Sequence, residues 1–120
     1  MMKTTVQENQ KEKLIDAVLK EYQKNGFESE KLIELLKELR EYFLAQENPL
    51  LTKTCRLVYE YIEQNKDFDV VPEIEDEEGE ILEIPEGTTP FEYLMELIRH
   101  SDNKFNIEEI KAFRSELQGY

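Results

Sequence analysis

The stretch that decides the fold is residues 29–65, which read SEKLIELLKELREYFLAQENPLLTKTCRLVYEYIEQN. Its first half repeats apolar residues at three- and four-residue spacing, the period of an α-helix with one buried face. Ser29 precedes this pattern as a capping residue, and Glu30 suits the positive end of the helix dipole. The apolar stripe consists of Leu32, Ile33, Leu35, Leu36, Leu39, Tyr42, Phe43 and Leu44. So wide a stripe predicts either a central helix with two neighbours or a helix that also forms a homodimer.

The dipeptide Asn48-Pro49 predicts the start of the next helix, because Asn caps a helix and Pro fits its first turn. This helix extends to about Asn65. Its buried residues are expected to be Leu51, Cys55, Val58, Tyr61 and Ile62.

Upstream, a further amphipathic helix is predicted from about Gln7 to Asn25. Gly26 ends it, since glycine accepts the left-handed backbone past a last turn, and Phe27 is placed to fold back onto Tyr22. Residues 1–6 are expected to be a disordered start. The short connections predict an antiparallel three-helix bundle over residues 7–65.

Residues 66–88 break the helical pattern and are predicted to form an acidic β-hairpin or a flexible crossover. Val70, Pro72 and Ile74 alternate with other residues, as do Leu82 and Ile84, around a central Glu78-Gly79. Such alternation is typical of a strand, and Pro72 confines its strand to a sheet edge.

Residues 89–120 are predicted to close the fold as a helical hairpin. Thr89-Pro90-Phe91-Glu92 reads as a capping box with proline at the first helical position. Asn106 is expected to cap the last helix. The expected fold class is thus mainly α: a single domain over residues 1–120, built as a bundle of about five helices with the hairpin or crossover inserted after the third helix.

The net charge of −13 is concentrated in one part of the chain. Residues 67–86, called the acidic segment below, contain ten acidic residues and no basic one. The other hundred residues therefore have a net charge of only −3. Such a segment repels nucleic acid and anionic membranes and attracts a basic protein surface.

The sequence contains few of the residues that catalytic and cofactor sites usually require. The chain has one His and one Cys, too few for a zinc site of several such ligands. His100 is expected to be a surface residue at a helix end, and Cys55 an inert core thiol. We therefore expect no cofactor, no metal site and no enzymatic activity.

The function expected from these features is that of a non-enzymatic interaction or adaptor domain with a basic protein partner. The candidate partner-binding residues are Glu73, Glu75, Asp76, Glu77, Glu78, Glu80, Ile81, Leu82 and Ile84. The last three could pair with a partner's sheet edge while the acids meet basic side chains. The alternative is a carboxylate-based enzyme or a regulatory domain that binds a divalent cation such as calcium.

A cytoplasmic location is expected. The chain shows no run resembling a signal peptide, no apolar run long enough to span a membrane, and no second Cys for an internal disulfide.

Overall fold

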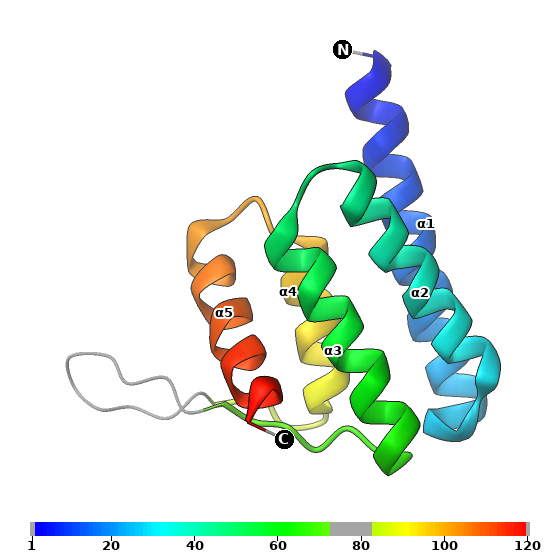
Figure 1. The fold of residues 1–120 in the computed structure, drawn as a ribbon, viewed down its shortest axis with the longest axis vertical. Helices are drawn as coiled ribbons and strands as arrows, with labels where there is room; N and C mark the ends of the chain where they lie inside the picture. The colour runs from blue at the N-terminus through cyan, green and yellow to red at the C-terminus, as the bar shows by residue number, and fades with distance from the viewer. Residues whose placement is uncertain (1, 73–82, 120) are drawn as a thin grey trace. The chain divides into compact units, whose positions relative to one another are not determined.

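Five α-helices make up most of the chain that the computed structural model describes, which is residues 2–72 and 83–119, with side chains from residue 9 onward (Figure 1). The helices are α1 (Met2–Asn25), α2 (Glu30–Ala45), α3 (Pro49–Asn65), α4 (Pro90–Arg99) and α5 (Lys104–Gln118), with a 3-10 turn, η1 (Gly26–Glu28), after α1. None of the described residues forms a strand. The prediction of a mainly helical chain with about five helices is confirmed.

The chain divides into two compact units, Met1–Asp67 and Phe68–Tyr120. The prediction of one domain over residues 1–120 stays a prediction. Within the described ranges, no helix combines the length and the apolar character that crossing a membrane requires.

The first unit is built around α2, which packs against both α1 and α3. The three helices run antiparallel in chain order (Figure 1). Their buried apolar residues are Ile15 and Val18 in α1, Leu32, Ile33, Leu36, Leu39 and Phe43 in α2, and Leu51, Cys55, Val58 and Ile62 in α3. The wide stripe of α2 therefore has the two neighbours that a central helix needs. The predicted homodimer through this helix stays a prediction, and Leu44, 50% exposed, is the apolar residue most available for it.

The turns between the helices of this unit are set by capping residues and a glycine at the helix ends. The Ser29 side chain accepts a hydrogen bond from the Leu32 backbone N–H (3.1 Å), and the Asn48 side chain accepts one from the Leu51 N–H (3.1 Å). Gly26 has a φ of +71° after α1, where a side chain would be strained. Both predicted caps and the glycine stop are therefore present.

The start of α1 differs from the predicted one. The helix begins at Met2, five residues before the expected start near Gln7, in the range expected to be disordered. Extending an existing helix costs little, because the unfavourable nucleation step has already been taken further along the chain.

The second unit contains the antiparallel pair α4 and α5 (Figure 1). The predicted capping box is present: the Glu92 N–H donates to Thr89 Oγ1 (3.2 Å), and the Thr89 N–H donates to Glu92 Oε1 (3.0 Å). The buried residues are Phe91, Leu94, Met95, Leu97 and Ile98 in α4, and Ile110, Phe113 and Leu117 in α5. A hydrogen bond from the Tyr93 hydroxyl to the Glu109 carboxylate joins the two helices.

The predicted start of α5 at Asn106 is wrong by three residues. Asn103 is the capping residue, and its side chain accepts a hydrogen bond from the Phe105 N–H (2.8 Å). The Asn106 side chain instead donates to the His100 carbonyl (3.0 Å). Either Asn has the right side chain for a cap, and Asn103 comes first after the turn that ends α4.

The predicted β-hairpin is not supported where the structure describes its flanks. Residues 67–72 and 83–89 form no strand, and Glu73–Leu82 lie outside the described residues. Phe68, Val70 and Pro72 are buried while Asp67, Asp69 and Val71 are exposed, so burial alternates over residues 67–72. The Phe68 ring packs edge-on against Phe91 of α4, with ring centroids 5.9 Å apart. An extended segment anchored by side chains shows the same period of two as a strand paired through its backbone.

Candidate functional site

The ends of the acidic segment lie at the surface. Its four described acids, Asp67, Asp69, Glu83 and Glu86, are all exposed, and none forms an ion pair with a residue that the structure describes. Of the predicted partner-binding residues, Ile84 is described and is half-buried. The other eight, Glu73, Glu75, Asp76, Glu77, Glu78, Glu80, Ile81 and Leu82, lie outside the described residues.

His100 occupies the helix end expected from the sequence. It is the C-terminal capping residue of α4, it is exposed, and its backbone N–H donates to the Glu96 carbonyl (3.1 Å). The Glu96 carboxylate accepts from Arg99 Nε with both oxygens at 3.1 Å, so its nearest cation is Arg99. The arrangement ends a helix.

Cys55, in α3, is fully buried. Burial raises the pKa of its thiol to about 12, which outweighs the opposite effect of the Arg40 guanidinium. The reactive thiolate is therefore suppressed at neutral pH. The prediction of a buried core thiol is confirmed.

Two further ionisable groups have structural partners. Glu21 is buried at the corner between α1 and α2, where it accepts hydrogen bonds from Ser29 Oγ (2.5 Å) and Asn25 Nδ2 (2.7 Å). These bonds lower the pKa of the Glu21 carboxyl. In the second unit, desolvation, followed by the hydrogen bond to Glu109, raises the pKa of Tyr93 to about 12. Both groups hold elements together.

Carboxylates are not gathered into a metal site in the part of the chain that is described. No group of three or more His, Cys, Asp or Glu side chains has the geometry to hold an ion there. A hollow of about 390 Å³ beside α1 and α2 brings Glu38 and Glu41 to its lining. Both are exposed, and Glu41 pairs with Arg40 (3.0 Å).

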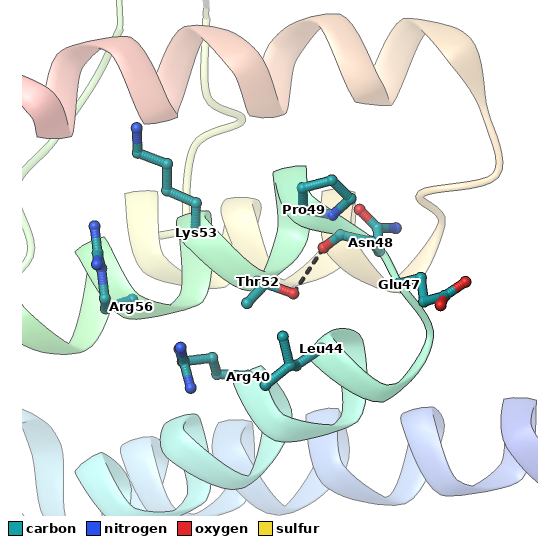
Figure 2. Close-up of a pocket in the computed structure, with 8 residues that line it drawn as sticks. All are labelled: Arg40, Leu44, Glu47, Asn48, Pro49, Thr52, Lys53 and Arg56. Carbon is teal, nitrogen blue, oxygen red and sulfur yellow. Dashed lines mark hydrogen bonds between the residues drawn. The ribbon is translucent and has the colours of Figure 1, made fainter.

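A larger cavity of about 650 Å³ lies in the first unit between the end of α2 and the start of α3 (Figure 2). We call it the Arg40–Arg56 groove. It is lined by Arg40, Leu44, Glu47, Asn48, Pro49, Thr52, Lys53 and Arg56. Three of these side chains are cationic and one is anionic, so the groove is basic in a chain whose net charge is −13.

This groove was not predicted from the sequence. A signal was present in the spacing. Arg40 and Leu44 share one face of α2, and Pro49, Lys53 and Arg56 share one face of α3. The short connection makes the two helices antiparallel, so these two faces lie beside each other. The cations of both faces then line the same groove.

Comparisons with protein-family models, curated proteins and solved structures found no match.

Proposed function

We propose that this chain is a non-catalytic interaction domain that binds a basic surface of a partner protein through the acidic segment. The observation that carries the proposal is the segregation of charge: ten acidic residues and no basic one within residues 67–86. The exposure of Asp67, Asp69, Glu83 and Glu86 supports it, because acids without internal partners stay available to an external one.

The physical role of these charges is to guide association. A dense patch of one sign accelerates the encounter with a patch of opposite sign and disfavours partners of like charge. Apolar contacts then slow dissociation, and Ile81, Leu82 and Ile84 are the residues of the segment suited to that role. The same charge disfavours nucleic acid and anionic membranes as ligands. The proposed location is the cytoplasm.

The alternative proposal is a carboxylate-based enzyme or a regulatory domain that binds a divalent cation. An enzyme of this kind requires acids that converge in a concave pocket. The cavity of about 650 Å³ has three cations and a single carboxylate in its lining, which favours the interaction domain over this alternative. Calcium titration followed by calorimetry separates the two proposals, since a cation-binding domain gives a saturable heat at stoichiometric calcium.

The experiment changes charge within the segment and compares it with an equal change elsewhere. One variant carries Glu75→Gln, Asp76→Asn, Glu77→Gln and Glu78→Gln. The control neutralises four acids of the first unit that are all exposed: Glu28, Glu34, Glu38 and Glu63. The net charge of both variants rises by four positive units, so a general effect of net charge on protein recovery is the same for both.

Each immobilised protein is used to capture proteins from a lysate of the source cells at several salt concentrations, and recovery is quantified by isotope labelling. We expect the segment variant to lose specific basic proteins that the control retains, most strongly at low salt, where screening is weakest. Equal recovery by both variants at every salt concentration would refute the proposed function.

A further inference from the structure

The Arg40–Arg56 groove places like charges opposite each other. The antiparallel pairing of α2 and α3 brings Arg40 and Arg56 to one end of the groove, Leu44 and Thr52 to its middle, and Pro49 with Glu47 to the other end (Figure 2). An anion in a cavity lined by several cations is attracted by each of them. The cationic end is therefore suited to a negatively charged group.

The cations of the groove are only partly neutralised by the chain itself. Arg40 Nη1 lies 3.0 Å from Glu41 Oε1, and Arg56 Nε lies 4.0 Å from Glu60 Oε1, the outer limit of an ion pair. Lys53 forms no ion pair with any described residue. The Arg40 Nε–H is buried, and it has no hydrogen-bond acceptor among the described residues. Because that N–H is buried, the hydrogen-bonding capacity for an external carboxylate lies in the exposed Arg56 guanidinium and Lys53 ammonium.

The middle of the groove is apolar and accessible. Leu44 is 50% exposed, one of three large apolar residues with such exposure in the described chain. The Thr52 hydroxyl donates its proton to the Asn48 carbonyl (2.7 Å; Figure 2), so this proton is not offered to a ligand in the groove. A ligand that fits both parts carries an anionic group next to an apolar one.

The shape of the groove favours a peptide over a small molecule. Sites for small molecules enclose most of the ligand surface, whereas the side chains of Leu44 and Arg56 remain about half exposed here. Arg40 and Leu44 are four residues apart, about 6 Å along α2. That length holds about two residues of an extended chain. Three cations without an aromatic ring in the lining are a poor platform for nucleic acid, which relies on stacking.

We propose that the Arg40–Arg56 groove is a docking site for an acidic peptide segment of a partner protein, with its carboxylates on the cations of the lining, Arg40, Lys53 and Arg56, and an apolar side chain on Leu44. This site is separate from the acidic segment, and it gives the domain a second surface of opposite charge.

The test uses the full chain and a short fluorescein-labelled peptide of Glu and Asp residues around one Leu, with binding followed by fluorescence anisotropy. The groove variant carries Arg40→Gln, Lys53→Gln and Arg56→Gln. The control carries Lys13→Gln, Lys20→Gln and Lys24→Gln, three exposed lysines of α1. Both variants lose three positive charges, and both retain the acidic segment, so neither property explains a difference between them.

We expect the groove variant to bind the peptide at least about tenfold more weakly than the wild type, and the control to stay within about twofold. Leu44→Ser should weaken binding of this peptide but leave a version with Gly in place of Leu unaffected. If the triple variant does not fold, Arg56→Gln alone provides the comparison, because this side chain is half exposed.

Three results would overturn the proposal. The first is an equal loss of binding in the groove variant and the control. The second is a Leu44→Ser effect that does not depend on the Leu of the peptide. The third is displacement of the peptide by inorganic phosphate at an equal concentration of charge, which would make the groove a simple anion site.

Discussion

Replacing Phe68 with Ala tests whether the extended segment at the start of the second unit is a fixed part of its core. Phe68 is 2% exposed and packs edge-on against Phe91, which is fully buried. Truncating a buried Phe to Ala typically costs about 3–5 kcal/mol, and this range includes the lost aromatic contact. Because Phe68 lies at the beginning of the segment, where the chain can partly collapse, we expect the lower end, about 3 kcal/mol.

The change in stability is measured by urea unfolding, followed by circular dichroism at 222 nm. With a slope of about 1–3 kcal/mol per molar urea, a loss of this size moves the midpoint down by about 1 M or more. Val71→Ala is the control, since Val71 lies three residues away in the same segment and is 43% exposed. It should change the stability by less than about 0.5 kcal/mol. Equal midpoints for the two variants would refute the anchoring role of Phe68.

Two further predictions concern buried ionisable groups. The pKa of Cys55 is raised from 9.0 to about 12, which lowers the thiolate fraction at neutral pH about a thousandfold. Alkylation of Cys55 by iodoacetamide should therefore require unfolding. Equal alkylation rates in buffer and in denaturing urea would contradict this. Hydrogen bonds from Ser29 and Asn25 hold the folded-state pKa of Glu21 below its ordinary value of 4.5. The ionised carboxylate therefore stabilises the fold fully above pH 4.5, and this stabilisation is lost as the pH falls through the folded-state pKa. The difference in urea midpoint between wild type and Glu21→Gln should therefore shrink below pH 4.5, and a constant difference would show that the carboxylate is not held as described.

The helices could be predicted because their signals are local. The hydrogen bonds that begin α2, α3 and α4 join residues three apart in sequence, from Ser29, Asn48 and Thr89. Such contacts form in a single helical turn and depend little on the rest of the chain. The apolar period of 3.6 residues likewise marked which face of each helix is buried.

What could not be predicted depends on partners distant in sequence. The alternation from Phe68 to Pro72 indicated a strand, yet the period alone does not say whether the partner is another strand or a helix. Glu47 and Lys66 adopt left-handed backbone conformations, with φ of 57° and 53°, although neither is a residue type typical of that region. The Arg40–Arg56 groove requires the register between two helices, which no single helical face reveals.

The helix corners have a consequence for how this fold would change during evolution. A core of Leu, Ile, Val and Phe tolerates many exchanges among apolar residues as long as the volume is kept. A corner is less permissive, because Gly26 at φ +71° and the hydrogen-bonded pair Thr89 and Glu92 each need particular residue types. Distant descendants of a common ancestor should therefore diverge most in the sequence of the core and keep the spacing of these corner residues. That spacing is the ancestry signal we expect to outlast overall sequence identity.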